Sequence, residues 1–388
     1  MNKKNDISDI VQSSIVCYHF FPHYRKGIIE ELSKQISPTF LGDDRGVEGI
    51  KPYKFCSTDK FIHGSCFYIG KLMVQPKTIW VALTGNYTNY IFLANPNHIS
   101  TWIAALICRL RRKQVVFWGH GFKSNKPTKS NSIRKVFFNL SNSFYTYGWR
   151  AKENAISLGF SSKKIHVGFN SLDYNTQLTV RNSLATVNSS DDQTLNIICI
   201  SRLTHACRYD LLFQAIELAK NKKPDMSFNI TLIGDGPERK NLEAIAQNLN
   251  LRTKFIGELY DEAIIAQHIS SADVTISPGK IGLTAMHSLM YGTPVVSNDD
   301  YVSQMPEVEA IVSGHTGEVF TNNDITSLSN ILICFKSNYP DRQKTRKDCF
   351  LMMDQIYNPF NQACILKMAI EGSDALEGKE TLSLYKER

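Results

Sequence analysis

The clearest pattern of apolar and polar positions lies between Val274 and Ser297. Residues 274–276 read as a buried strand that ends at Ser277-Pro278-Gly279, because proline cannot donate a hydrogen bond to a sheet ladder. Apolar residues then recur at helical spacing up to a glycine and a proline, the usual helix stop. Residues 295–296 begin another strand. The pattern predicts a strand–helix–strand unit of the kind found in parallel α/β sheets.

The same rhythm recurs on both sides of a polar stretch rich in serine and asparagine, residues 181–194, which is typical of a linker. Strands are expected before it at 14–21, 90–94, 114–118 and 143–147, and after it at 195–200, 228–233 and 254–258. Helical patterns separate most of them, whereas residues 38–80 show only short strand-like pieces. With 388 residues the chain is long enough for two domains, each with its own core.

Composition narrows the class of protein. A hydrophobic content of 43% and a charged content of 21% are typical of a globular protein outside the membrane. The N-terminus is polar, without the apolar core of a signal peptide, and no run approaches the ~20 apolar residues of a membrane span. The nine cysteines are scattered without a CxxC pair. We therefore expect a reduced, cytoplasmic protein without structural zinc.

Charge is divided unevenly along the chain. Residues 1–180 hold 24 Lys and Arg against 10 Asp and Glu, and the remainder holds 20 against 26. A basic first half favours nucleic acid, anionic lipid or a phosphorylated acceptor as partner. No helix-turn-helix, zinc finger or RNP-like pattern accompanies the charge, so we expect no nucleic acid. The helix predicted over 101–110 ends in Arg109, Arg111, Arg112 and Lys113. These cations either suit the helix dipole or, with the apolar residues, form a face for a membrane surface.

The turn before the helix near Gly282 predicts an anion site. Backbone N–H groups at the start of a helix lack intrahelical partners and lie at the positive end of its dipole. Those of Gly282, Leu283 and Thr284 are therefore expected to bind a diphosphate.

The surrounding motif resembles a known family. Its order, a strand followed by SP, G-x-x-GL, a helix and YGTPVV, resembles the nucleotide-sugar motif of GT-B glycosyltransferases of the large fourth sequence family, which includes many bacterial polysaccharide enzymes. GDGPE at 234–238 and NSLD at 170–173 are similar to further motifs of that family. The family usually has one Glu three residues before the GL glycine and another five after it. Here these positions are Gly279 and His287.

The resemblance implies an α/β protein with two Rossmann-like domains whose parallel sheets face a central cleft. It suggests an acceptor domain at 1–180, the linker at 181–194 and a nucleotide-sugar donor domain at 195–345. Residues 346–388 would form a helix that crosses back to the first domain, followed by a loose tail.

The resemblance also implies donor residues in the second domain. Arg202 matches an arginine that neutralises the donor diphosphate. The family's partner lysine is replaced by Cys207, so Arg208, one residue further, is the expected second cation, because arginine can grip a phosphate with two donors. Gly279 and His287 stand where the family contacts the donor sugar and ribose. The family stacks the nucleotide base near the residues that match Gly257 and Glu258.

Two segments are candidate sites in the first domain. His120 lies between two glycines at the end of a predicted strand, where the family has a histidine that contacts the donor sugar near the reacting carbon. His23, Tyr24 and Arg25 follow the first strand, at the edge where α/β sheets bind ligands, and are candidate acceptor residues. A flexible turn and a helix cap are the alternatives for these two segments.

The implied reaction is transfer of a sugar from a nucleotide diphosphate sugar to a hydroxyl of a lipid-linked glycan, in synthesis of a bacterial surface polysaccharide such as O-antigen or capsule. No DxD motif is present, so we expect neither metal nor cofactor, with Arg202, Arg208 and the helix N-terminus stabilising the departing phosphate. Retention of configuration is the expected outcome. Inversion needs a base from the first domain, where carboxylates are few and lie at Asp43, Asp44, Glu48 and Asp59.

The expected location is cytoplasmic, with contact to the inner face of the cell membrane through the basic first domain. Two other classes remain open. A non-catalytic GT-B partner explains the loss of both glutamates. A nucleotide-sugar epimerase shares the architecture, but it needs carboxylates in its cleft, and Gly279 and His287 argue against it.

Overall fold

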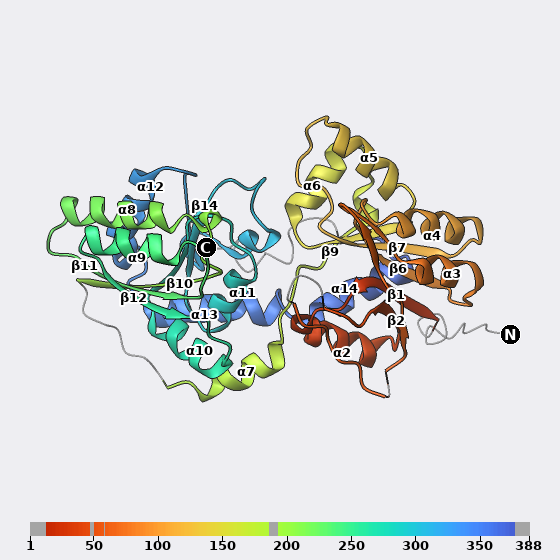
Figure 1. Cartoon of the computed structure of the whole chain (residues 1–388), viewed down its shortest axis with the longest axis horizontal. Helices are drawn as coiled ribbons and strands as arrows, with labels where there is room; N and C mark the ends of the chain where they lie inside the picture. Colours follow the sequence, from red (N-terminus) through yellow and green to blue (C-terminus); the bar gives the residue numbers. More distant parts are fainter. Residues whose placement is uncertain (1–12, 47–49, 58, 186–192, 377–388) are drawn as a thin grey trace. The chain divides into compact units, whose positions relative to one another are not determined.

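The computed structural model describes residues 13–46, 50–57, 59–185 and 193–376 (Figure 1). The chain divides into two compact units. Unit 1 comprises residues up to Asp173 together with those from Asn358 onward, and unit 2 comprises Tyr174–Tyr357. The expected linker therefore begins inside a helix of unit 2, and its residues 186–192 lie outside the described part, as does Glu48.

Unit 1 contains a parallel sheet that has seven strands among the described residues, in the order β3-β2-β1-β6-β7-β8-β9. The strands are β1 (Ser14–Phe20), β2 (Thr39–Asp43), β3 (Phe61–His63), β6 (Asn89–Leu93), β7 (Gln114–Gly119), β8 (Ser143–Thr146) and β9 (Ile165–Val167). Alternate residues of β1 enter two different cores, with Val16 and Tyr18 on one face and Ile15 and Cys17 on the other. The strands read as continuous apolar runs because helices cover both faces.

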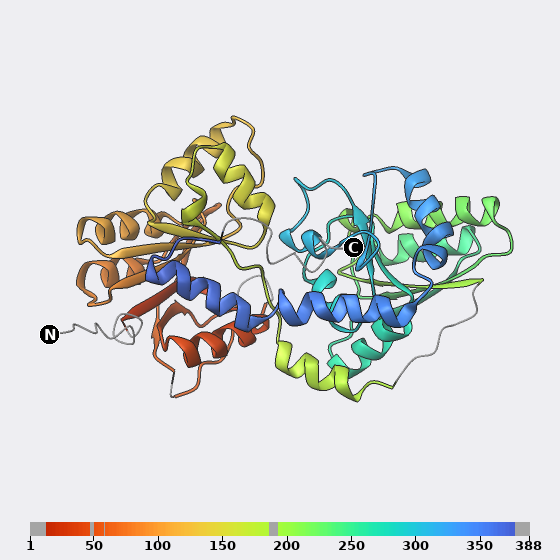
Figure 2. The ribbon, with the colours of Figure 1, turned by 180° about the vertical axis from the view of Figure 1, so that it is seen from behind.

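The helices of unit 1 are α2 (Lys26–Gln35), α3 (Pro76–Thr84), α4 (Ile99–Leu110), α5 (Lys129–Phe138), α6 (Trp149–Ser157) and α14 (Pro359–Glu371), with 3-10 turns η1 (His23–Arg25) and η2 (Ser162–Lys164). An antiparallel hairpin, β4 (Phe67–Ile69) and β5 (Leu72–Val74), precedes α3. The C-terminal helix α14 packs beside α2 and against β7, β8 and β9, and Figure 2 shows it in blue among the red and yellow elements of unit 1. Its Ala363, Leu366, Ala369 and Ile370 join the core that contains Val16.

Unit 2 is a second α/β unit, whose described sheet has six parallel strands in the order β12-β11-β10-β13-β14-β15. The strands are β10 (Thr194–Ile200), β11 (Ser227–Ile233), β12 (Arg252–Gly257), β13 (Val274–Ser277), β14 (Val295–Asn298) and β15 (Gly317–Phe320). The helices are α7 (Tyr174–Ser183), α8 (Tyr209–Lys222), α9 (Arg239–Asn248), α10 (Glu262–Ser271), α11 (Leu283–Met290), α12 (Ile325–Asn338) and α13 (Arg342–Gln355), with η3 (His205–Cys207) and η4 (Pro306–Ala310). The predicted strand–helix–strand unit is confirmed as β13, α11 and β14.

Helix α7 shows why the boundary between the units differs from the expected linker. Its sequence is polar, yet Tyr174 and Gln177 are buried and the helix packs against α10 and α11. Arg181, inside the expected linker, pairs with Asp354 of α13 at 3.0 Å. In the part of the chain that the structure describes, no helix combines the length and apolar character needed to cross a bilayer.

Candidate functional site

The N-terminus of α11 lies at the carboxyl-terminal edge of the unit 2 sheet. Gly282 precedes the helix, and no described residue accepts a hydrogen bond from the backbone N–H groups of Gly282, Leu283 or Thr284. The Thr284 hydroxyl donates to the carbonyl oxygen of Ile200 at 3.2 Å, which holds the helix start beside the end of β10. Three N–H groups at the positive end of a helix dipole are thus available to an anion.

Arg202 follows the strand end that α11 contacts. Its side chain is exposed and makes no hydrogen bond or ion pair with the described residues. Its carbonyl oxygen accepts from the thiol of Cys207 at 3.0 Å, which fixes the loop between β10 and α8. The structure therefore brings the predicted Arg202 and the predicted helix N-terminus to the same edge of one sheet.

Arg208 is held by protein groups. It has a left-handed backbone conformation (φ 54°), its Nε donates to Asp210 at 3.3 Å, and another of its guanidinium N–H groups donates to Asn323. Cys207, at the family's lysine position, is half-buried against Ser201 at 3.1 Å. Arg202 is thus the arginine of this loop whose donors remain available.

Gly279 allows two loops to touch. A Cβ at this position would lie 1.9 Å from the carbonyl oxygen of Ala206, so no side chain fits. The Gly279 N–H donates to Cys207 at 3.0 Å, and its carbonyl oxygen accepts from Asn298 at 2.8 Å and Gln304 at 3.1 Å. Both polar groups of Gly279 are thus bound within the protein, and the residue permits close approach of the two loops. The donor-sugar contact expected at this position stays a prediction.

His287 bonds to a carboxylate of another helix. Its Nε2 lies 2.8 Å from Oε1 of Glu262, at the start of α10. The same oxygen accepts from Gln177 at 3.0 Å and from the hydroxyl of Tyr291. Burial alone raises the pKa of Glu262, but the hydrogen bonds, first that from His287, outweigh it and lower the pKa to about 2. These four residues, here named the Glu262 cluster, place an ionised carboxylate beside the position where the resembled family has its second glutamate.

Gly257 ends β12 and Glu258 follows it, just before the segment that leads to the Glu262 cluster. The carbonyl oxygen of Gly257 accepts from Gly234 at 2.7 Å, and Gly257 has a positive φ of 87°. The Glu258 carboxylate accepts from the hydroxyl of Tyr260 at 2.8 Å, and the Tyr260 side chain is 83% exposed. The predicted base-binding residues and the cluster are therefore joined by one short loop.

In unit 1, Arg25 lies among three aromatic rings. Its guanidinium is 5.1 Å from the ring centre of Tyr18, 5.2 Å from that of Trp118 and 5.8 Å from that of Tyr147. It donates to the Tyr147 hydroxyl at 2.7 Å. Burial raises the pKa of Tyr18 well above its usual value, so this phenol is neutral beside the cation. Stacking against ring faces and a hydrogen bond fix the arginine rigidly.

Tyr147 joins Arg25 to His120. The exposed His120 ring packs edge-on against Tyr147 with 5.0 Å between centres. The two predicted residues follow β1 and β7, and Tyr147 follows β8, so all three lie at the carboxyl-terminal edge of the unit 1 sheet. His23 is exposed with its Nδ1 3.2 Å from the carbonyl oxygen of Lys51, and the half-buried Tyr24 packs against it.

Three of the carboxylates considered as a base in unit 1, Asp43, Asp44 and Asp59, are engaged by other protein groups. Asp43 receives two bonds from the Arg45 guanidinium, at 2.9 and 2.7 Å, which hold its pKa well below the usual range. Asp44 pairs with His63 at 3.1 Å, and the ligand atoms of Asp43, Asp44 and His63 lie within 4.8 Å of one another. Asp59 accepts from the backbone of Cys56 at 2.7 Å. Because Arg45 neutralises Asp43 and His63 pairs with Asp44, ion pairs within the protein account for the grouping of Asp43, Asp44 and His63.

Comparison with known proteins identifies unit 2. Residues 181–349 match the family model "Glycosyl transferases group 1". This part of the chain is a group 1 glycosyltransferase domain. No curated protein sequence matches the chain.

Solved structures extend the likeness to both units. Alr3699/HepE of Anabaena in complex with UDP is similar at 15% identity over 92% of this chain and 99% of its own, with a TM-score of 0.64. The lipopolysaccharide outer core galactosyltransferase WaaB is similar at 16% identity over 92% and 98%, with a TM-score of 0.65. A glycosyltransferase of Rickettsia africae gives 13% identity over 93% and 99%, with a TM-score of 0.66. The chain has the GT-B fold, built from two Rossmann-like domains, and the match to the glycosyltransferase family covers residues 181–349.

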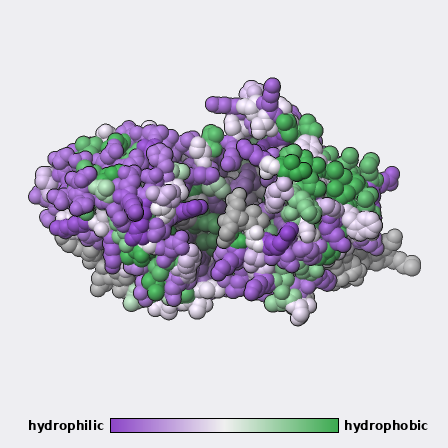
Figure 3. All heavy atoms as spheres, in the orientation of Figure 1, coloured by the Kyte–Doolittle hydropathy of each residue, from purple (hydrophilic) through white to green (hydrophobic). Residues whose placement is uncertain are grey.

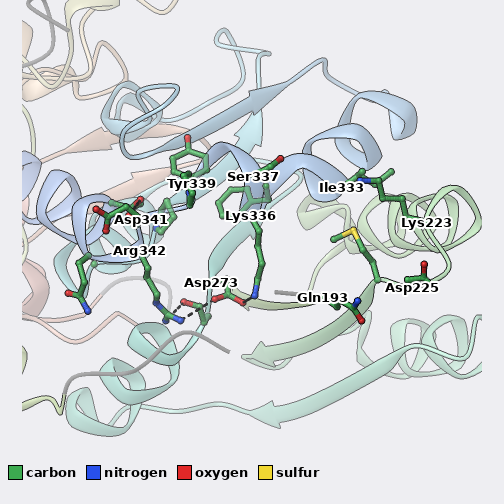
Figure 4. A pocket seen from close by; sticks show the side chains of 18 residues that line it. Gln193, Lys223, Asp225, Asp273, Ile333, Lys336, Ser337, Tyr339, Asp341 and Arg342 are labelled. Atoms are coloured by element: carbon green, nitrogen blue, oxygen red, sulfur yellow. Dashed lines mark hydrogen bonds and ion pairs between the residues drawn. The ribbon is translucent and has the colours of Figure 1, made fainter. Parts of the chain in front are cut away.

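A cavity of about 790 Å³ in the glycosyltransferase domain lies at the other edge of its sheet (Figure 4). Asp273, which precedes β13, is 3.1 Å from Arg342 and 3.9 Å from Lys336, and all three line this cavity. These three charged groups pair at the amino-terminal end of β13. The cavity is therefore separate from the Gly282 turn at the carboxyl-terminal end.

Sequence reasoning missed three features of the candidate site residues in the two units. Glu262 and Gln177 reach His287 from other helices. Tyr147 connects Arg25 with His120, although a sequence signal existed, because Tyr147 follows a predicted strand. Lys280 is exposed inside the G-x-x-G turn, one residue from Gly279, and its position in the motif could have marked it.

Proposed function

We propose that this glycosyltransferase transfers a sugar from a nucleotide diphosphate sugar to a hydroxyl of a lipid-linked glycan, in the synthesis of a bacterial surface polysaccharide. The observation that supports binding of the nucleotide-sugar donor is the uncapped N-terminus of α11 at the same sheet edge as the exposed Arg202. The titles of the Alr3699/HepE structures include UDP and UDP-glucose, so a uridine diphosphate sugar is the first donor to test. The name of WaaB, a lipopolysaccharide galactosyltransferase, supports the surface-polysaccharide setting.

The donor diphosphate binds the backbone N–H groups of Gly282, Leu283 and Thr284. Arg202 contributes a two-donor guanidinium, and Lys280 adds a second cation at the same turn. Arg208, held by Asp210 and Asn323, keeps the β10–α8 loop in place and strengthens the local positive potential. The Glu262 cluster receives the ribose through His287 and Glu262, and the loop after Gly257 and Glu258 receives the base.

In the reaction, the bond from the anomeric carbon to the phosphate oxygen breaks as a bond to the acceptor oxygen forms. The leaving phosphate takes the acceptor proton on the same face, which retains configuration. The helix N-terminus and Arg202 stabilise the negative charge that develops on the phosphate, a preorganised arrangement that needs no metal ion. From unit 1, His120 contacts the donor sugar, and Arg25 with His23 and Tyr24 orients the acceptor. The protein acts in the cytoplasm at the inner face of the membrane.

The test is binding of UDP, GDP, dTDP, CMP and ADP to the purified chain, measured by calorimetry without metal. We expect one diphosphate to bind selectively, and Arg202→Ala to weaken it by about 1.5–3 kcal/mol, the range for a hydrogen bond to a charged group. The matched control is Arg252→Ala, which removes an exposed arginine at the amino-terminal end of β12 and leaves the affinity unchanged. If no nucleotide binds, the donor site is absent and the chain is a non-catalytic GT-B protein.

A further inference from the structure

Unit 1 carries an exposed apolar surface formed by three neighbouring elements, here named the hairpin–helix face. Figure 3 shows apolar side chains gathered over the α3 and α4 region. The residues that form this face, all between 42% and 76% exposed, are Phe67, Tyr68, Ile69 and Leu72 of the β4–β5 hairpin, Trp80 and Leu83 of α3, and Ile103, Leu106 and Leu110 of α4. Large contiguous apolar patches on soluble proteins mark sites of interaction.

Helix α4 leaves three large apolar residues facing outward, although its Trp102 and Ile107 pack against the core. It buries Ala104, Ala105 and Cys108 against the core, whereas Ile103, Leu106 and Leu110 recur at spacings of three and four and face solvent. A helix that faced only water would carry polar residues at such positions. Helix α3 packs along α4 and exposes Trp80 and Leu83 in the same way. Folding of unit 1 therefore leaves several large apolar side chains of both helices uncovered.

The hairpin is anchored firmly although its side chains are exposed. The Met73 N–H donates to the carbonyl oxygen of Asn97 at 2.9 Å, and the Gln75 N–H donates to the Ser100 hydroxyl at 2.7 Å, which ties β5 to the start of α4. At its tip, Gly70 has a positive φ of 59° and lies in open space. The turn thus presents Ile69 and Leu72 to solvent, next to the anchored end of β5.

The charge around this face selects a lipid partner. Residues 60–152 contain 14 Lys and Arg and no Asp or Glu. Lys71 at the hairpin tip, Lys77 on α3 and Arg109 and Arg112 at the end of α4 are all exposed. Cations beside aromatic and aliphatic side chains, in a segment of the sequence without acidic residues, complement an anionic lipid surface, where each Lys or Arg contributes about 1 kcal/mol.

The hairpin also begins at the edge of the sheet that carries the candidate acceptor residues. The Cys66 N–H donates to Asp43 at the end of β2, and its thiol donates to the carbonyl oxygen of His19 near the end of β1. The Gln75 side chain, at the other end of the hairpin, donates to Tyr18 at 3.1 Å. Within unit 1, the hairpin–helix face is therefore continuous with the strand ends that precede Arg25.

We propose that the hairpin–helix face docks on an anionic phospholipid bilayer, with Phe67, Ile69, Leu72 and Trp80 entering the interface and the neighbouring lysines and arginines contacting lipid phosphates. The docking itself does not require glycosyl transfer. Its role in bringing a lipid-linked acceptor to unit 1 rests on the proposed function.

The test uses the full chain and sedimentation with vesicles of phosphatidylcholine alone or with about 30% phosphatidylglycerol. We expect strong binding only to the anionic vesicles, which falls when salt is raised from about 0.05 to 0.5 M. The double variant Ile69→Asp/Leu72→Asp should lower partitioning at least about tenfold. Leu351→Glu, an equally drastic change at a residue of unit 2 that is 39% exposed, is the matched control and should bind as the wild type does.

A second pair of variants isolates the charge. Lys71→Gln/Lys77→Gln should weaken binding to anionic vesicles by about 25-fold, about fivefold for each cation removed. Both substitutions of this variant lie on the surface, so its thermal unfolding should match that of the wild type. The docking proposal can therefore still be tested if the Ile69→Asp/Leu72→Asp variant misfolds.

Two outcomes overturn the proposal. One is a monomeric chain that binds neither vesicle. The other is a dimer in sedimentation velocity that Ile69→Asp/Leu72→Asp dissociates, because the face then binds a second copy. Nucleotide binding is measured on the same samples. A chain that binds UDP but no vesicles contradicts only the docking proposal. A chain that binds anionic vesicles but no nucleotide contradicts only the proposed donor site.

Discussion

Glu262 concentrates three hydrogen bonds on one carboxylate oxygen. His287, Gln177 and Tyr291 all reach its Oε1, and together they hold its pKa near 2 against the effect of burial. The folded state therefore favours the ionised carboxylate more than the unfolded chain does. This contribution to stability is complete above the pKa of about 4.3 in the unfolded chain and is lost as pH falls towards 2.

Glu262→Gln tests this linkage. The wild type should be more stable than the variant by on the order of 2 kcal/mol at pH 7, and the difference should shrink between pH 5 and 3. Urea unfolding at a series of pH values measures it. Glu217→Gln, at an exposed residue of α8 without a partner among the described residues, gives the baseline. A difference for Glu262→Gln that stays constant down to pH 3 would contradict the assigned hydrogen bonds.

Single residues were predictable where their chemistry is local. Arg202 and Gly282 each stand within a short motif, and the structure brings them to one sheet edge. Glu262 could not be found in this way, because it meets His287 from a different helix, 25 positions earlier, and Gln177 lies 85 positions from Glu262. A sequence reveals spacing within an element more readily than contact between elements.

Two loops of unit 2 meet at Gly279. The turn after β13 lies against η3 so closely that a Cβ at Gly279 would overlap the Ala206 carbonyl oxygen. The absence of the family's first glutamate is therefore part of the backbone arrangement, and a single substitution cannot reverse it. Any side chain at this position must separate the loop that carries Arg202 from the turn that carries Gly282.

Gly279→Glu restores the family residue and should nevertheless harm the protein. We expect a loss of at least about 3 kcal/mol of stability, since the overlap is with backbone, together with loss of nucleotide binding. Lys280→Ala, which removes the adjacent exposed side chain, should leave the melting temperature unchanged. Thermal unfolding and calorimetry on both variants decide the point, and a stable Gly279→Glu with improved affinity would refute it.

Elements were predictable in proportion to their burial. Strands β7, β10 and β13 are buried over most of their length, and β7 and the second half of β10 appear as unbroken apolar runs. Strand β3 has three residues, and the β4–β5 hairpin exposes most of its side chains, so neither produces a clear alternation. The least legible stretch, residues 38–80, proved to contain the hairpin of the proposed lipid-binding face.

At the scale of the whole molecule, the two units differ in how they respond to acid. His98 and His166 of unit 1 are 6% and 2% exposed, and burial lowers the pKa of each to about 4. Below pH 6.5 these histidines become protonated in the unfolded chain, whereas in the folded protein they stay neutral until the pH approaches 4. Their contribution to stability is therefore complete above pH 6.5 and is lost as pH falls towards 4.

Unit 1 should accordingly become the weaker unit at mildly acidic pH. At pH 5 each of the two histidines costs about 2 kcal/mol of stability. Hydrogen exchange resolved by peptide should show protection falling across unit 1 between pH 7 and 5 while unit 2 changes less, after correction for the intrinsic exchange rate. Equal loss in both units would show that these histidines do not govern acid stability.

The two-unit architecture followed from the repeated α/β rhythm, but the boundary did not. The expected linker at 181–194 was chosen for its polar composition, whereas α7 begins at Tyr174 and binds unit 2 through a few residues such as Gln177 and Arg181. A helix that buries only a narrow stripe resembles a linker in composition. The contacts that assign it to a unit lie on α10, α11 and α13.

Helix α14 gives the chain an order of folding that differs from its order of synthesis. The ribosome makes most of unit 1 first, but the core of that unit stays open until Ala363 to Ile370 emerge, after all of unit 2. Unit 2 can fold before α14 is made, whereas part of the unit 1 core stays exposed until then. A stop codon before Pro359 should consequently destabilise unit 1, which precedes it in the chain, and spare unit 2.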